Sequence, residues 1–214
     1  TRKKNLGKTW STIVEYANEA KPGDRVLDVG CGNGRLLEAF ENKNIKYLGL
    51  DASSELLAHA RKQKPEAEFR EGNILELGKM PETDFDWVFG MAVFHHIPGK
   101  NLQIQALRQL KNKVATDGRI IITVWNMWSE HWKKKNFRKL IWRFWLLGLF
   151  GKNKMDFGDI LVDWKNQKGE AVSQRYYHAF RKGELKRLAK KAGLKVERIF
   201  KDDKNYYLIL KREA

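Results

Sequence analysis

One stretch near the N-terminus constrains most strongly what this chain can fold into. Residues 26–34 read VLDVGCGNG, in which an apolar β-type run passes directly into a glycine-rich turn and then into a helical pattern. Gly30, Gly32 and Gly34 allow a tight backbone turn and leave space where side chains would otherwise stand. The helix N-terminus behind them offers unpaired N–H groups to a bound molecule. The stretch therefore predicts an α/β sheet with a ligand site after its first strand.

Short apolar runs and helical patterns alternate along the rest of the chain. The expected strands are residues 25–29, 47–50, 68–71, 86–89, 119–124, 195–200 and 206–210, and the expected helices are residues 34–42, 54–64, 102–114 and 184–192. This alternation is typical of a Rossmann-like, doubly wound sheet. The last two strands are separated by the short polar segment 201–205, which predicts an antiparallel hairpin at the end of the chain.

Chain length and one unusual segment set the expected domain organisation. The 214 residues suit a single domain, which we expect to span residues 1–214. Residues 125–174 interrupt the α/β pattern after the fifth strand and are rich in Trp, Lys and Arg. We interpret this segment as a basic, aromatic insertion.

The charge of the chain is concentrated in its second half. Residues 1–100 hold 15 basic and 15 acidic residues, whereas residues 101–214 hold 27 basic and 11 acidic ones and carry the whole net charge of +16. A neutral half joined to a basic half favours a polyanionic partner such as nucleic acid. Lysine-rich helix faces exposed to solvent and contact with a membrane surface are the alternatives.

Several classes of protein are excluded by what the sequence lacks. The longest run without Asp, Glu, Lys or Arg has 13 residues (87–99), whereas a membrane-spanning helix needs roughly 20 apolar residues. No apolar segment follows the charged N-terminus, so we expect no signal peptide. A single cysteine, Cys31, cannot form an internal disulfide and is too few for a zinc site. We therefore expect a cytoplasmic protein with no transmembrane segment and no metal centre.

Polar residues near the ends of three expected strands complete a candidate nucleotide site. Asp28 precedes the glycine turn, where a carboxylate repels a pyrophosphate but suits the cationic end of an amino acid. Asp51 ends the second strand, in position to accept both hydroxyls of a ribose. Asn73 follows the third strand, in position to bind the edge of an adenine. Taken singly, Asp51 and Asn73 are also explained as helix caps.

Taken together, VLDVGCGNG, Asp51, EGNI and DFDWVFGMAVFHHI resemble the class I S-adenosylmethionine-dependent methyltransferases. The resemblance extends from about Trp10 to the C-terminus and implies S-adenosylmethionine as the cofactor. It also implies a sheet of seven strands with the last strand antiparallel. By motif position, the implied cofactor contacts are Asp28, Gly30 and Gly32 at the methionine part, with Gly34 completing the turn, Asp51 and Ala52 at ribose and adenine, Asn73 and Ile74 at adenine, and Met91 at the amino-acid end.

The second half of the chain is similar to one subfamily of these enzymes. FGDILVDWK, QRYYHAFRKGEL and KNYYLILK, in this order, resemble the eukaryotic tRNA wobble-uridine carboxymethyl methyltransferases. The resemblance implies a tRNA methyltransferase that forms a methyl ester on 5-carboxymethyluridine in the anticodon loop. Eukaryotic members use a small zinc-binding activator protein, so the resemblance raises such a partner for this chain. A small-molecule O- or N-methyltransferase acting on a carboxylic acid or a quinone precursor is the alternative function.

The implied reaction needs few catalytic groups. A carboxyl group with a pKa of about 4 is already ionised at neutral pH, so its methylation needs no general base. We expect Arg175 to orient the substrate carboxylate, with Tyr177, His178 and His96 as hydrogen-bonding supports. Without the resemblance, residues 175–178 are better explained as a strand with alternating buried aromatic side chains and an exposed charge.

The insertion combines aromatic and basic side chains. Its residues of these kinds include Trp128, Trp132, Trp142, Trp145, Lys133, Lys134, Lys135, Arg138, Lys139 and Arg143. Aromatic rings stack on unpaired bases while Lys and Arg neutralise phosphates, so we favour contact with tRNA. Residues 136–150 also form an amphipathic pattern, which leaves a cover over the active site, contact with a protein partner, and contact with a membrane surface as alternatives.

Overall fold

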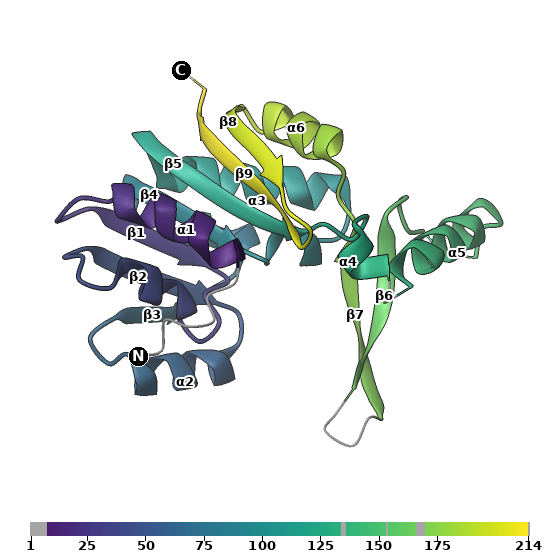
Figure 1. The fold of residues 1–214 in the computed structure, drawn as a ribbon, viewed down its shortest axis with the longest axis horizontal. Coiled ribbons are helices and arrows are strands. Elements are labelled where there is room, and N and C mark those ends of the chain that lie inside the picture. The colour runs from purple at the N-terminus through teal and green to yellow at the C-terminus, as the bar shows by residue number, and fades with distance from the viewer. Residues whose placement is uncertain (1–7, 134–135, 153, 166–169, 214) are drawn as a thin grey trace.

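A seven-stranded sheet forms the centre of the molecule (Figure 1). The computed structural model describes residues 8–133, 136–152, 154–165 and 170–213. The strands lie in the order β3-β2-β1-β4-β5-β9-β8. Their bounds are β1 Arg25–Val29, β2 Lys46–Asp51, β3 Glu68–Glu71, β4 Phe85–Met91, β5 Val114–Trp125, β8 Leu194–Lys201 and β9 Asn205–Arg212.

The strand directions agree with the sequence-based prediction. β1 to β5 pair in parallel, whereas β9 runs antiparallel to both β5 and β8. Residues 205–210 of β9 are buried without a break because the strand lies inside the sheet and is covered on both faces. The doubly wound sheet of seven strands, with the last strand antiparallel and paired in a terminal hairpin, is therefore confirmed.

Helices cover both faces of the sheet. One face carries α1 Lys8–Glu19, η2 Arg35–Phe40 and α2 Ser54–Gln63, and the other carries η3 Ile74–Lys79, η4 Phe94–His96, α3 Lys100–Lys113 and α6 Lys182–Lys191. The helix expected over residues 34–42 is a short 3-10 helix, η2, because Gly34 before it and Asn42 after it both adopt positive φ angles, of 72° and 69°. Among the helices of the described ranges, none is long and apolar enough to cross a bilayer.

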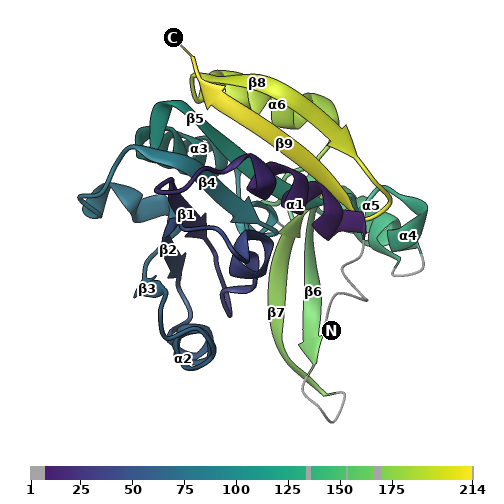
Figure 2. The same cartoon turned by 60° about the vertical axis from the view of Figure 1, so that its left-hand side comes forward.

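The insertion stands away from the sheet (Figures 1 and 2). It consists of α4 Glu130–Lys133, α5 Phe137–Leu149, β6 Asp159–Lys165 and β7 Ala171–His178. β6 and β7 form a separate antiparallel ribbon. A third hydrophobic cluster, which includes Trp132, Ile141, Ile160 and Tyr177, holds these elements together. Because Tyr177 packs in this cluster, the structural insertion extends to the end of β7, four residues beyond the predicted boundary at residue 174.

Candidate active site

The three glycines of the turn after β1 differ in how much space surrounds them. Gly30, Gly32 and Gly34 all have positive φ angles. A methyl group added at Gly30 would lie 2.7 Å from the Val93 side chain, and one at Gly34 would lie 2.7 Å from the Phe69 ring. At Gly32 the same methyl group would meet no atom within 4 Å. Gly32 is therefore the position at which the turn is open to a bound molecule.

Asp28 lies buried beside this turn. The hydroxyl of Tyr47 donates a hydrogen bond of 2.9 Å to Asp28 Oδ2. Asp28 Oδ1 is buried and has no hydrogen-bond partner among the described residues. Burial, opposed in part by the Tyr47 hydrogen bond, raises the pKa of Asp28 to about 7. A cationic group near the turn would supply the interaction that this carboxylate lacks.

Asp51 connects the end of β2 to the glycine turn. Its Oδ2 accepts a hydrogen bond of 2.8 Å from the Gly32 N–H, and its Oδ1 accepts one of 2.9 Å from the Ser53 N–H. The carboxylate is half-buried, and each oxygen keeps acceptor capacity for a hydroxyl. Ala52 follows it on the exposed surface. The bond to Gly32 goes beyond helix capping, because it links two elements of the predicted site.

Asn73 lies between β3 and η3 and caps η3. Its Oδ1 accepts a hydrogen bond of 2.9 Å from the Leu75 N–H, so the alternative of a helix cap is realised here. The side chain is exposed and lines a hollow of about 300 Å³ with Leu50 and Gly72, while Ile74 is buried behind it. The capping bond uses only the oxygen, so the amide N–H₂ remains the part of Asn73 suited to a ligand.

The end of β4 carries an unusual backbone turn that the sequence did not indicate. Ala92 has a φ angle of 56°, and its N–H donates hydrogen bonds to the carbonyl and the hydroxyl oxygen of Thr123. The half-buried Met91 precedes it, and Val93 follows and packs on Gly30. A left-handed conformation of a residue with a Cβ is held only where the surroundings enforce it. The turn therefore brings the end of β4 against the glycine turn after β1.

The two histidines after β4 have different surroundings. His95 is fully buried, and its Nδ1 accepts a 3.4 Å hydrogen bond from the Trp125 N–H. His96 is exposed, and its Nδ1 lies 3.1 Å from the carbonyl oxygen of Tyr176. Partial burial and the positive charge of Arg175 lower the pKa of His96, although the bond to Tyr176 opposes them. A carbonyl oxygen only accepts, so His96 Nδ1 carries the proton and Nε2 of the neutral ring is an acceptor.

Three of the four predicted substrate-binding residues lie on β7, where successive side chains point to opposite faces of the strand. The Tyr177 ring lies 4.7 Å from the His96 ring and stacks on Trp125 with centroids 5.1 Å apart. Arg175 is exposed on the same face of β7 as Tyr177, close enough to His96 to lower its pKa. The structure thus brings His96, Arg175 and Tyr177 together. His178 lies on the opposite face of the strand.

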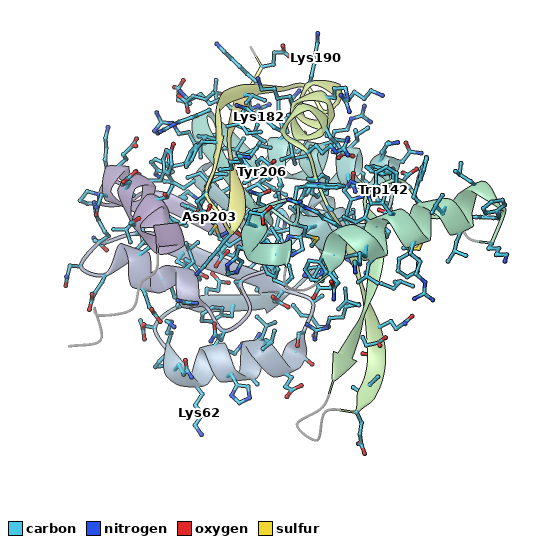
Figure 3. The ribbon with its side chains drawn as sticks, turned by 45° about the vertical axis from the view of Figure 1, so that its right-hand side comes forward. Lys62, Trp142, Lys182, Lys190, Asp203 and Tyr206 are labelled. Atoms are coloured by element: carbon cyan, nitrogen blue, oxygen red, sulfur yellow. The ribbon has the colours of Figure 1, made fainter. Side chains whose placement is uncertain are left out.

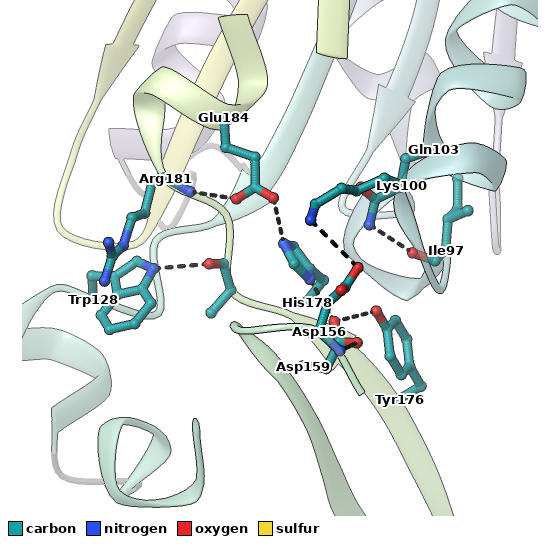
Figure 4. A network of polar contacts seen from close by, with 11 residues as sticks. Ile97, Lys100, Gln103, Trp128, Asp156, Asp159, Tyr176, His178, Arg181 and Glu184 are labelled. Atoms are coloured by element: carbon teal, nitrogen blue, oxygen red, sulfur yellow. Dashed lines mark hydrogen bonds and ion pairs between the residues drawn. The ribbon is translucent and has the colours of Figure 1, made fainter. Parts of the chain in front are cut away.

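His178 forms a buried bridge between the ribbon and α6 (Figure 4). Its Nδ1 lies 2.5 Å from Asp159 Oδ1, its Nε2 lies 3.0 Å from Glu184 Oε1, and the Tyr176 hydroxyl donates a 2.5 Å bond to the same Asp159 oxygen. Burial alone would lower the pKa of His178, but the bonds to the two carboxylates raise it to about 9. Both ring nitrogens are occupied, so the predicted contact between His178 and a substrate carboxylate does not fit this geometry. We assign His178 a positioning role.

Comparison with known proteins identifies related sequences. A family model described as a methyltransferase domain matches residues 3–199. The tRNA (carboxymethyluridine(34)-5-O)-methyltransferase of Schizosaccharomyces pombe is 25% identical over 226 residues, which cover 96% of this chain and 88% of that protein. The Xenopus tropicalis tRNA (carboxymethyluridine(34)-5-O)-methyltransferase alkbh8 is 26% identical, and the match covers 95% of this chain but 37% of that protein.

Solved structures share the fold over nearly the whole chain. A SAM-dependent methyltransferase of Methanosarcina mazei has a TM-score of 0.72 at 18% identity, over 92% of this chain and 96% of that chain. The complex of DhpI with SAH has a TM-score of 0.66 at 17% identity, over 95% of this chain and 84% of that chain. Since the family model matches residues 3–199, the chain belongs to the methyltransferase-domain family, and it shares the fold of the SAM-dependent methyltransferase of Methanosarcina mazei.

Proposed function

We propose that this protein methylates tRNA at the wobble uridine, forming a methyl ester on 5-carboxymethyluridine in the cytoplasm. Among the relatives named for this activity, those of Schizosaccharomyces pombe and Xenopus tropicalis match 96% and 95% of the chain. The observation that carries the proposal is the group formed by Arg175, His96 and Tyr177. It combines a cation and a polar ring next to the end of β4, with the buried Tyr177 ring packed against His96, which suits a polar base that bears a carboxylate.

The residues along the carboxyl ends of the strands fit S-adenosylmethionine as the cofactor. Asp28, with its unpaired Oδ1, suits the amino-acid end, and the open space at Gly32 admits the middle of the molecule. Asp51 retains acceptor capacity for the ribose hydroxyls, and Asn73 offers its amide nitrogen to the adenine. When bound, the cofactor supplies a methyl group on a positively charged sulfur.

The protein's contribution to such a reaction is orientation rather than proton transfer. The substrate carboxylate is already ionised at neutral pH, because its pKa is about 4. Arg175 holds the carboxylate through its two-pronged guanidinium and aims one oxygen at the methyl group. The neutral His96 presents an acceptor at Nε2, which suits an N–H of the uracil ring and not the carboxylate.

The test is nucleoside mass spectrometry of tRNA that carries 5-carboxymethyluridine, after incubation with the purified protein and S-adenosylmethionine. We expect the free acid to disappear and the mass of one methyl group to appear on the same nucleoside. Arg175→Ala is expected to lower kcat/KM by about 10- to 100-fold, the range for losing a hydrogen bond to a charged group. Arg198→Ala, which removes an exposed arginine on β8, is the matched control and is expected to leave kcat/KM unchanged.

Two results would count against the proposal. If the protein binds the cofactor and modifies free carboxylic acids but not tRNA, the alternative of a small-molecule methyltransferase is correct. If Arg175→Ala methylates tRNA as fast as the parent, the carboxylate is oriented by another group. If the purified protein is inactive, the assay is repeated with a small zinc-binding activator of the kind that eukaryotic relatives use. This shows whether the preparation lacks a partner.

A further inference from the structure

A row of cations follows the exposed face of α6. Lys182, Lys186 and Lys190 are spaced four residues apart, so they lie on one side of the helix with a rise of about 6 Å from one to the next. Figure 3 shows Lys182 and Lys190 pointing outward from this helix. The apolar side chains of α6 are buried on its other side. The helix has one acidic residue, Glu184, and its carboxylate is bonded to His178. The lysine row therefore has no carboxylate on its own helix to neutralise it.

The exposed side of α5 adds cations and an aromatic ring. Lys139 and Arg143 are exposed, and Trp142 between them exposes 50% of its surface. These three residues line a surface hollow of about 680 Å³. The surrounding sequence, residues 131–155, contains eight Lys and Arg residues and no Asp or Glu. This part of the insertion is thus as one-sided in charge as α6.

Two side chains join these surfaces into one. The Phe157 ring lies 5.6 Å from the Trp142 ring, and the guanidinium of Arg181 lies 4.8 Å from the Phe157 centroid. Arg181 directly precedes α6, so these two side chains connect Trp142 on α5 to the start of the lysine row. We call this surface the cationic track and define it by Lys139, Trp142, Arg143, Lys182, Lys186 and Lys190.

The composition of the track indicates the chemistry of its partner. Phosphates neutralised by Lys and Arg supply a large share of the affinity of nucleic-acid complexes, and an exposed indole stacks on an unpaired base. An anionic membrane would suit α5, but the α6 part exposes no apolar side chain that enters a lipid layer. A second copy of the chain would bring like charges together. Of these three partners, a phosphate backbone suits both helices best.

We propose that the cationic track binds the phosphate backbone of the RNA substrate outside the reacting nucleoside. This inference rests on the proposed function, because it assigns the same RNA a second contact surface. The α6 part of the track starts at Lys182, four residues beyond His178, and the His178 bridge fixes α6 relative to the ribbon that carries Arg175. The bound backbone is thus held in a fixed position relative to the group that orients the reacting base.

Charge reversal on α6 tests the inference. The variant Lys182→Glu, Lys186→Glu, Lys190→Glu is compared with the control Lys21→Glu, Lys46→Glu, Lys62→Glu, which changes the net charge equally at exposed positions elsewhere. Lys62 lies on α2, well away from α6 in Figure 3. We expect the α6 variant to bind tRNA at least 10-fold more weakly and to lower the slope of log Kd against log salt by about 2 to 3. The control is expected to change Kd by less than 3-fold.

Further measurements separate this inference from general charge effects and from misfolding. Trp142→Ala is expected to weaken tRNA binding by at least 5-fold while Trp142→Phe retains it, because the stacking ring is kept. Affinity for S-adenosylmethionine is expected to be equal in all variants and serves as the check on folding. If the α6 glutamate variant fails that check, the triple Lys→Gln variant replaces it, with a smaller loss in the same direction.

Each contrary result has its own meaning. Equal losses in the α6 and control variants, or no loss in either, would overturn the inference. The inference would also be overturned if the parent bound phosphatidylglycerol vesicles through the track but bound tRNA independently of the track. If the parent binds tRNA through the track but transfers no methyl group to it, the proposed function fails and the inference stands. If the parent methylates tRNA and the α6 variant binds tRNA as tightly, the inference fails alone.

Discussion

At the scale of single residues, Asp51 makes the contact that most clearly shapes the proposed cofactor site. Its carboxylate fixes the Gly32 N–H at the open point of the glycine turn and keeps capacity for ribose hydroxyls. We expect Asp51→Ala to weaken binding of S-adenosylmethionine by about 10- to 100-fold, as when a hydrogen bond to a charged group is lost. Isothermal titration calorimetry measures this, and Glu55→Ala, an exposed acid at the start of α2, is the control. Equal effects of the two variants would show that only net charge matters.

Local motifs predict the contact between the glycine turn and Asp51, whereas contacts between distant positions have no such signal. The glycine turn and Asp51 follow directly from an apolar strand and its end, and the structure brings them into contact. His178 was beyond local analysis, because its partners Asp159 and Glu184 lie 19 and 6 residues away and nothing in the spacing pairs them. The sequence did allow one prediction about β7, because side chains at positions two apart lie on the same face of a strand. This alternation separates Tyr177 from His178.

At the scale of elements, we expect a glycine-to-alanine substitution to have different effects at two positions of the glycine turn. Gly30→Ala places a methyl group 2.7 Å from Val93, whereas Gly32→Ala meets no atom within 4 Å. Both alanines also adopt a positive φ angle, which costs roughly 1 to 2 kcal/mol. We expect Gly30→Ala to lower the free energy of unfolding by about 2 to 4 kcal/mol and Gly32→Ala by about half as much.

Urea unfolding and calorimetry on these two variants separate packing from ligand access. Gly32→Ala is expected to lose affinity for S-adenosylmethionine out of proportion to its modest loss of stability, because its methyl group stands in the open space that we propose for the cofactor. The reverse order of stabilities would contradict the packing of Val93 against the turn.

The bridge between the ribbon and α6 makes the stability of the protein depend on pH. The pKa of His178 is about 9 in the folded protein, above its ordinary value of 6.5. The stabilisation is therefore complete below pH 6.5 and is lost as pH rises through 9. We expect the parent to lose up to about 3 kcal/mol more than His178→Gln between pH 6.5 and 9.5, measured by denaturant unfolding. Parallel pH profiles for the parent and the variant would show that the imidazole is neutral in the folded protein.

The insertion is the element that the sequence described least completely. Its aromatic and basic composition was evident, but its division into two helices and a ribbon was not. Tyr177 stacks on Trp125 from 52 positions along the chain, and Trp132 stacks on Trp125 in turn. Packing of this kind is decided by tertiary contacts among large side chains and not by periodicity, so no local pattern predicts it.

At the scale of the whole molecule, the excess positive charge and the predicted cofactor contacts lie in different halves of the chain. The predicted cofactor contacts lie within residues 28–91, in the half whose basic and acidic residues balance, while the cationic track lies in the basic half. We expect the Kd for S-adenosylmethionine to change by less than about 2-fold between 50 and 200 mM salt, while tRNA affinity falls by at least about 10-fold. A cofactor affinity that falls as steeply as tRNA affinity would show that the two sites share one electrostatic field.

The buried carboxyl group of Asp28 couples cofactor binding to the exchange of a hydrogen ion with the buffer. With a pKa of about 7, roughly half of the protein molecules carry a proton on Asp28 at neutral pH. A cation placed beside it favours the ionised form, so ligand binding expels that proton. Binding releases about half a proton per molecule at pH 7. The binding enthalpies measured in phosphate and in Tris are therefore expected to differ by about half of the difference between the ionisation enthalpies of the two buffers. Asp28→Asn is expected to abolish this difference, because the amide has no proton to release; the parent protein, in contrast, stores a proton at this position until the ligand binds.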